Sequence, residues 1–236
     1  MQSISLSRRE SEYSVTLPSP KAVIFDWDNT LVNTWPVIHE AMTATFEAMG
    51  HTPWTLDETK ARVRKSMRDA FPELFGADWQ KAGEIYQTYY IDHSLTKLKP
   101  LPGAAEVLQR IADKGLYNVV VSNKKGPTLR REVEHMGWVP FFQNIVGADD
   151  AARDKPHADP VHMAFDKSGI IPARDVWFIG DSDVDLECAL NTGCTAILYG
   201  ELAKVHPEYT DTHFQGQPYH AHVHNHKEVL ALLGYK

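Results

Sequence analysis

Short apolar runs recur along the chain, and stretches with helical spacing of apolar residues separate them. Three of the runs, at residues 22–25, 117–121 and 176–179, are rich in β-branched and aromatic residues. Such runs are typical of strands that are buried on both faces of a sheet. Further strands are expected near Asn144 and Thr195. Strands that alternate with helices predict a parallel sheet with right-handed crossovers, so we expect an α/β fold.

Residues 33–97 interrupt this alternation, because their pattern is helical throughout. One helix carries an apolar stripe from Val37 to Met49, and another is expected between Trp79 and Leu95. The start of the chain is polar and rich in Ser and Arg, which favours a loose tail. The sequence therefore predicts three units, a flexible tail, an α/β core domain and an inserted helical domain, at residues 1–20, 21–32 with 98–236, and 33–97.

Polar side chains follow the apolar runs. Ligands in open α/β sheets bind beyond the carboxyl ends of the strands, so chemistry is expected at these positions. Asp26 and Asp28 come directly after the first run, and two carboxylates so close together repel each other unless a cation lies between them. A hard divalent cation with oxygen ligands, such as Mg²⁺, would relieve that repulsion. Four further polar positions join them at or between the later strand ends: Ser122, Asn123, Lys155 and Asp181.

Four short motifs resemble, in the same order, those of the haloacid dehalogenase superfamily of hydrolases, nearest to its phosphoglycolate phosphatase branch. They are Asp26-x-Asp28-x-Thr30, Ser122, Lys155 before Pro156, and Gly180-Asp181-Ser182-x-x-Asp185. The resemblance extends from Lys21 to Ala196. It implies a Rossmann-like parallel sheet core flanked by helices, with an inserted α-helical cap domain of the C1 type.

The chain departs from the usual pattern of this superfamily at Asn29, where the relatives have Gly. Asn adopts the left-handed backbone conformation more readily than most residues, so we expect the loop to keep its shape. Asn33 and Thr34 stand where Asp-Ser is common.

The resemblance implies a Mg²⁺-dependent phosphatase that acts on a small phosphorylated metabolite. Asp26 would attack phosphorus and form an aspartyl phosphate, and Asp28 would serve as general acid and base. The other implied roles fall into three groups. The phosphoryl group would be held by Ser122, Asn123 and Lys155. Mg²⁺ would be bound by Asp26, the main-chain carbonyl of Asp28 and Asp181, with Asp185 orienting Lys155 or a metal-bound water. A second anionic group of the substrate would be bound in the cap by Arg64 and Lys65.

Two alternative functions stay open. A sugar-phosphate mutase of the same superfamily would carry a cap histidine at the position of Ile38, and His39 lies one residue away. A non-catalytic regulatory or binding module would show a broken catalytic position, and none of the four motifs is broken.

Two local features also have structural interpretations. Asp183 is interpreted as the cap of the helix that follows. Four histidines alternate near the C-terminus, namely His220, His222, His224 and His226. On a strand they would share one face, which could bind Zn²⁺ or Ni²⁺. The preferred interpretation is an exposed edge strand.

Composition narrows the partners. The 236 residues carry a formal net charge of −7, with 43% hydrophobic and 23% charged residues. An acidic chain is a poor match for nucleic acid, which basic surfaces bind. No apolar run approaches the roughly 20 residues that span a bilayer, and the N-terminus has no apolar signal core, so we expect a cytoplasmic protein without membrane contact, monomeric or homodimeric. Cys188 and Cys194 are expected to be buried thiols without a disulfide.

Overall fold

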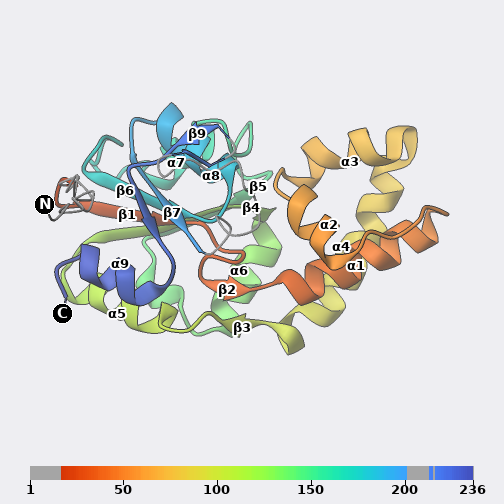
Figure 1. Ribbon diagram of the computed structural model, residues 1–236, viewed down its shortest axis with the longest axis horizontal. Coiled ribbons are helices and arrows are strands. Elements are labelled where there is room, and N and C mark those ends of the chain that lie inside the picture. The colour runs from red at the N-terminus through yellow and green to blue at the C-terminus, as the bar shows by residue number, and fades with distance from the viewer. Residues whose placement is uncertain (1–16, 201–212, 215, 236) are drawn as a thin grey trace, which may run out of the picture.

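The computed structural model describes residues 17–200, 213–214 and 216–235. Most of the predicted N-terminal tail lies outside these residues. Among the described residues, six strands form one parallel sheet in the order β10-β7-β6-β1-β4-β5 (Figure 1). Their bounds are β1 (Ala22–Phe25), β4 (Tyr117–Lys125), β5 (Asn144–Ala148), β6 (Val176–Gly180), β7 (Thr195–Tyr199) and β10 (Ala221–Val223).

Helices cover both faces of this sheet. Side chains alternate along β1, so that Val23 and Phe25 enter one apolar cluster while Ala22 and Ile24 enter the other. The first cluster lies under α5 (Ala104–Asp113), α6 (Gly126–His135) and α9 (His226–Leu232), together with the short helix η2 (Val139–Phe141). The second lies under α7 (Asp159–Ala164) and α8 (Asp183–Asn191). A sheet buried on both faces explains why the strands read as continuous apolar runs.

Four helices lie together beside this core and contribute no strand to its sheet (Figure 1). They are α1 (Trp35–Ala48), α2 (Leu56–Arg62), α3 (Met67–Phe75) and α4 (Trp79–Lys97), with the short helix η1 (Gly76–Asp78) between the last two. We call them the helical unit. The unit has an apolar cluster of its own, in which Met42 and Phe46 of α1 pack with Phe71 of α3 and Tyr90 of α4.

Two adjacent segments join the helical unit to the core. They form a small antiparallel pair, β2 (Val32–Asn33) with β3 (Lys99–Pro100), so the chain leaves and re-enters the core at one place (Figure 1). A second hairpin, β8 (His213–Phe214) with β9 (Gln217–Pro218), precedes β10.

The predicted parallel α/β fold is confirmed, and each expected strand is present. β4 differs in one respect, because it continues to Lys125 instead of ending at Val121, although its pairing with β5 is interrupted between these residues. Cys188 and Cys194 are buried free thiols, as predicted. None of the helices in the described ranges has the length and apolar character needed to cross a bilayer.

Candidate active site

The loop after β1 carries the two acidic residues of the first motif to the edge of the sheet. The amide of Asp26 still donates to the carbonyl of Ile179 on β6, at 2.9 Å, so the start of this loop is fixed by the neighbouring strand. Asn29 then adopts the left-handed conformation, with φ of 58°, as predicted. Its side-chain oxygen accepts from the amide of Thr34 at 3.2 Å, which ties the loop to the start of α1.

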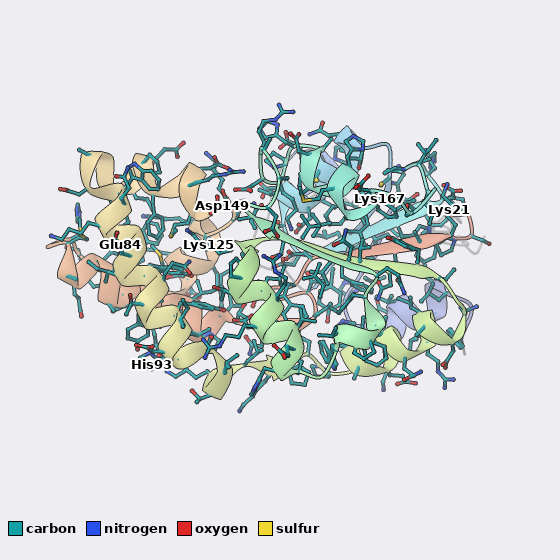
Figure 2. All side chains as sticks on the ribbon, turned by 180° about the vertical axis from the view of Figure 1, so that it is seen from behind. Lys21, Glu84, His93, Lys125, Asp149 and Lys167 are labelled. Carbon is teal, nitrogen blue, oxygen red and sulfur yellow. The ribbon has the colours of Figure 1, made fainter. Side chains whose placement is uncertain are left out.

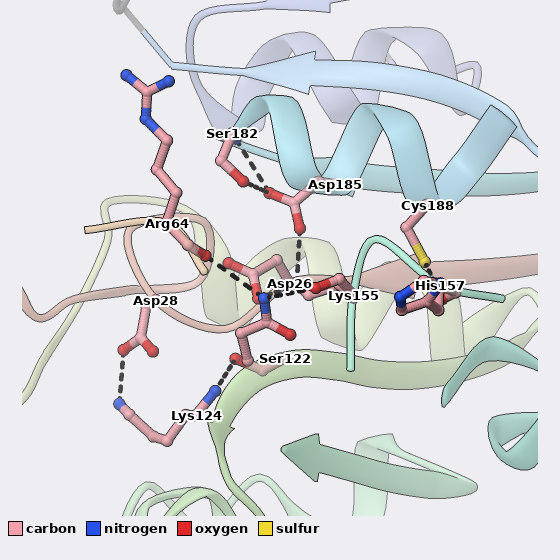
Figure 3. Close-up of polar contacts among 11 residues, drawn as sticks. Asp26, Asp28, Arg64, Ser122, Lys124, Lys155, His157, Ser182, Asp185 and Cys188 are labelled. Atoms are coloured by element: carbon pink, nitrogen blue, oxygen red, sulfur yellow. Dashed lines mark hydrogen bonds and ion pairs between the residues drawn. The ribbon is translucent and has the colours of Figure 1, made fainter. Parts of the chain in front are cut away.

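Lys155 lies between two carboxylates at the centre of the site (Figure 3). Its Nζ is 2.8 Å from Oδ1 of Asp26 and 2.6 Å from Oδ1 of Asp185, and all three side chains are buried. Burial alone would lower the pKa of Lys155, but the two carboxylates outweigh it and the pKa lies above its usual range. Lys155 is therefore a fixed positive charge beside Asp26.

Asp185 reaches Lys155 because the segment before it is closely packed. Ser182 caps α8 in a capping box, and Oδ2 of Asp185 accepts from the amide of Ser182 at 3.0 Å and from its hydroxyl at 2.6 Å. A Cβ atom at Gly180 would lie only 2.4 Å from Cβ of Asp185, so glycine is required for this approach. The interpretation of Asp183 as the helix cap is wrong, because Ser182 is the N-cap residue of α8 and Asp183 is already in the first turn.

Three buried acids converge beside Lys155. Asp26, Asp181 and Asp185 offer carboxylate oxygens that lie within 4.8 Å of one another. Burial and the neighbouring carboxylates raise the pKa of Asp26 to about 7, against the lowering effect of Lys155, and the same two causes raise the pKa of Asp181 well above its usual range. A single lysine thus does not balance the negative charge of this cluster. An all-oxygen donor set with excess negative charge fits a hard divalent cation such as Mg²⁺.

The end of β4 contributes further polar groups to the site. The pairing of β4 with β5 is interrupted after Val121, and the side-chain amide of Asn123 donates to the carbonyl of Lys155 at 3.1 Å. Ser122 is buried, and its hydroxyl oxygen accepts from the amide of Lys124 at 3.3 Å.

Lys124 belongs to a buried network that sequence reasoning missed. Its Nζ lies 2.5 Å from Oδ1 of Asp28 and 2.6 Å from Oε2 of Glu132, which also accepts from the indole of Trp27 at 2.8 Å. Burial lowers the pKa of Lys124, but Asp28 and Glu132 raise it by more, so the ammonium stays charged. This network fixes the carboxyl group of Asp28. The signal in the sequence is weak, since a glutamate within an amphipathic helix is ordinarily a solvated residue.

A cavity of about 140 Å³ opens over these groups and extends under the helical unit. The structure brings most of the predicted site residues to its wall: Asp26, Asp28, Ser122, Asn123, Lys155, Asp181, Arg64 and Lys65. Asp185 does not line the cavity and lies behind Lys155. The Arg64 guanidinium is directed away from Asp26 (Figure 3) and lies 3.3 Å from Oδ2 of Asp183. The ammonium of Lys65 lies 3.2 Å from Glu73.

Residues 23–199 match the family described as haloacid dehalogenase-like hydrolase. The chain belongs to this family. The resemblance expected from the four motifs is therefore confirmed, and so is the enzyme class, a hydrolase whose relatives are phosphatases.

Relatives of this hydrolase include proteins named as phosphatases. A phosphoglycolate phosphatase from Rhodobacter capsulatus is 27% identical over 192 residues, covering 76% of this chain and 84% of that protein. An N-acetylmuramic acid 6-phosphate phosphatase from Pseudomonas aeruginosa is 32% identical over 206 residues, covering 82% of this chain and 87% of that protein. Among solved structures, a haloacid dehalogenase-like family hydrolase from Streptococcus pneumoniae is similar in fold, with a TM-score of 0.75 at 24% identity. The match covers 90% of this chain and 97% of that chain.

The helical unit of the hydrolase contacts the core next to Lys155. Arg68 of α3 donates from Nε and Nη2 to the two oxygens of Asp154, both at 2.7 Å, and Asp154 is buried. Arg68 Nε also lies 3.5 Å from Oδ1 of Asp149, a more exposed core residue that pairs with Lys125 of the core (Figure 2). A bidentate pair to a buried carboxylate is the stronger of the two contacts.

Replacing Arg68 by Met is expected to lower the free energy of unfolding by about 1–3 kcal/mol, because the buried carboxylate of Asp154 loses its charged partner. Urea denaturation measures this change. The matched control is Arg62→Met, whose pair with Glu58 is about half exposed on both sides and is expected to contribute less than about 1 kcal/mol. Equal effects of the two substitutions would contradict the prediction.

The four C-terminal histidines of the hydrolase do not share one strand face. β10 is the edge strand that was predicted, but it covers only residues 221–223, and His226 is the buried first residue of α9. Its ring lies 3.0 Å from the hydroxyl of Tyr199, whereas His220 accepts from the amide of Ala196. The expectation of a single histidine face is wrong, because the strand ends at Val223 and helix α9 begins at His226.

Proposed function

We propose that this hydrolase is a Mg²⁺-dependent phosphatase that cleaves small phosphate monoesters through an aspartyl-phosphate intermediate on Asp26. The observation that carries this proposal is the cavity whose wall holds Asp26 and Asp28 together, with the ammonium of Lys155 at 2.8 Å from Asp26. Phosphate esters resist nucleophiles through their own negative charge, so a site that hydrolyses them must neutralise charge and align the attacking oxygen. Phosphatases among the relatives support the same conclusion.

In the first step, a carboxylate oxygen of Asp26 attacks phosphorus, and the bond from phosphorus to the leaving-group oxygen breaks. Asp28 gives its proton to that oxygen, so the product leaves as a neutral alcohol. The contact of Asp28 with Lys124, and of Lys124 with Glu132, holds the acid in one orientation.

In the second step, water attacks the phosphorus of the aspartyl phosphate. Asp28 now takes a proton from that water, and the bond from phosphorus to Asp26 breaks, which releases inorganic phosphate and restores both carboxyl groups. Two displacements replace a single difficult one.

Lys155, Ser122 and Asn123 are proposed to hold the phosphoryl group. Lys155 supplies positive charge close to the attacking oxygen, and Asp185 keeps its ammonium in place. Ser122 and the backbone amides near Asn123 donate hydrogen bonds to phosphoryl oxygens. In the helical unit, Arg64 and Lys65 line the same cavity and are proposed to contact the leaving group.

Asp26, Asp181 and the main-chain carbonyl of Asp28 are the proposed Mg²⁺ ligands, with Asp185 next to them. A divalent cation there would offset the negative charge that raises the pKa values of Asp26 and Asp181, and so favour the ionised nucleophile. The chemistry that the cation would supply is neutralisation of charge at the phosphoryl group.

Phosphate release from a panel of phosphorylated metabolites, in Mg²⁺ and in EDTA, tests this function. Turnover is expected in Mg²⁺ and is expected to fall at least about 100-fold in EDTA, since several kcal/mol of charge stabilisation would be lost. Mg²⁺ is also expected to raise the melting temperature of the wild type but not that of Asp181→Asn. Turnover that is insensitive to EDTA would contradict the metal assignment.

The mutase alternative gains no support from the site. His39 Nδ1 lies 3.0 Å from the hydroxyl of Thr59, and His39 is not part of the cavity wall. The non-catalytic module predicts a missing catalytic group, whereas Asp26, Asp28 and Lys155 all line the cavity.

A further inference from the structure

The cavity has two chemically different walls. The core wall holds the catalytic groups around Asp26, whereas the wall formed by the helical unit is mainly apolar and aromatic. Its side chains come from α1, α3 and α4 and include Trp35, Ile38, Met42, Phe71, Leu74 and Tyr86. The leaving group must occupy this part of the cavity when the phosphoryl group lies at Asp26.

The cations in the cavity wall are already paired within the chain. Among the described residues that line it, each one has a side-chain nitrogen within 3.5 Å of a carboxylate oxygen, as the distances for Arg62, Arg64, Lys65, Lys124, Lys125 and Lys155 show. Three of these pairs involve the helical unit, where Arg64 lies against Asp183 and Lys65 against Glu73.

A second anionic group on the substrate would therefore meet an unfavourable environment. At Arg64 and Lys65 it would share the cation with Asp183 or Glu73. Elsewhere on this wall it would be buried against aromatic rings without a counter-ion, which costs free energy. An apolar group gains by leaving water for the same surface.

The size of the cavity limits the leaving group to about one ring, because the phosphoryl group shares the same space. Its volume of about 140 Å³ compares with the roughly 150 Å³ of an engineered apolar protein cavity that binds benzene. Gln87 also lines the wall and offers an amide for one hydroxyl or carbonyl of the ligand.

We infer that the preferred substrates are phosphate monoesters whose leaving group is uncharged beyond the ester and presents an apolar face of about one ring to the helical unit. This inference rests on the proposed phosphatase function. It opposes the sequence-based expectation that Arg64 and Lys65 bind a second anionic group, because both cations are already paired with carboxylates.

The test compares kcat/KM for three esters with the full chain in Mg²⁺: phenylethyl phosphate, ethyl phosphate and phosphoglycolate. The leaving alkoxides of the first two are similar in basicity, so the difference between them reports on binding by the apolar wall. Phenylethyl phosphate is expected to exceed both other esters by about tenfold or more. A kcat/KM for phosphoglycolate that equals or exceeds that for phenylethyl phosphate would overturn the inference and leave the phosphatase function standing. Hydrolysis of none of the three, nor of any wider panel member, would overturn both.

A variant pair locates the effect. Tyr86→Ala removes a ring from the cavity wall and is expected to lower the ratio of kcat/KM for phenylethyl phosphate to that for ethyl phosphate by about tenfold. Tyr89→Ala, on the same helix but outside the cavity wall, is expected to leave this ratio unchanged. A folded Tyr86→Ala enzyme with the wild-type ratio would overturn the assignment of the apolar wall. If Tyr86→Ala does not fold, the comparison of the three esters with wild type still decides.

Discussion

Replacing Asp26 by Asn is expected to lower kcat by roughly 10⁴-fold or more, which is the order of loss when the nucleophile of a covalent mechanism is removed. An amide oxygen does not attack phosphorus at a useful rate. The measurement is phosphate release in Mg²⁺ with the best ester of the panel. The fold is not expected to suffer, since Lys155 keeps its contact with Asp185 at 2.6 Å.

The control for this experiment is Asp113→Asn, an exposed acid on α5 whose side chain pairs with Gln109. It is expected to retain full activity. Thermal unfolding should show Asp26→Asn within about 1 kcal/mol of wild type, because burial raises the pKa of Asp26 to about 7 and its charge is therefore costly near neutral pH. An Asp26→Asn protein that folds and still turns over at more than a hundredth of the wild-type rate would exclude Asp26 as the nucleophile.

Replacing Lys155 by Met is expected to have the largest effect on stability. The substitution leaves Asp26 and Asp185 buried without their shared counter-ion, and removal of one partner from a buried ion pair typically costs about 3–5 kcal/mol. Urea denaturation in EDTA at pH 8 measures the loss. Adding Asp185→Asn to Lys155→Met is expected to recover part of it, because one unpaired carboxylate is removed.

The matched control is Lys21→Met, which breaks an ion pair with Asp175 that is about 40% exposed on both sides. Lys21 lies at the end of the core opposite the helical unit (Figure 2), and its loss is expected to cost less than about 1 kcal/mol. Similar losses in the free energy of unfolding for Lys155→Met and Lys21→Met would contradict the large contribution expected of the buried ion pair.

The pH dependence of stability follows from the acids around Lys155. Burial raises the pKa of Asp26 from 3.8 to about 7, so between these values the folded protein binds a proton that the unfolded chain has released. Metal-free stability is then expected to fall as the pH rises through this window, and Lys155→Met steepens the fall because the lowering effect of the ammonium is lost. Stability of Lys155→Met that increases from pH 5 to pH 7 would argue against this origin.

The sequence by itself was sufficient for the sheet and for the positions of the acids. Each strand is a local run of apolar residues, and the acids follow these runs directly. The positions of the strands and of the acids could therefore be predicted from the local sequence alone. The left-handed conformation of Asn29 was predictable for the same reason, because it reflects the steric preference of a single residue. The order of the four motifs identified the family before any geometry was known.

The tertiary structure decided which charges are paired and what the substrate meets. Glu132 contacts Trp27 across 105 residues of sequence, and Arg68 contacts Asp154 across 86 residues. No local pattern specifies such partners, since a charged residue on a helix has the same periodicity whether it faces water or a buried carboxylate. The cations Arg64 and Lys65 looked available from the sequence, but the fold places Asp183 and Glu73 against them. The sequence shows which residues are charged, but only the fold decides which of them are paired. The apolar wall of the cavity likewise appears only in the structure, because its side chains come from three separate helices.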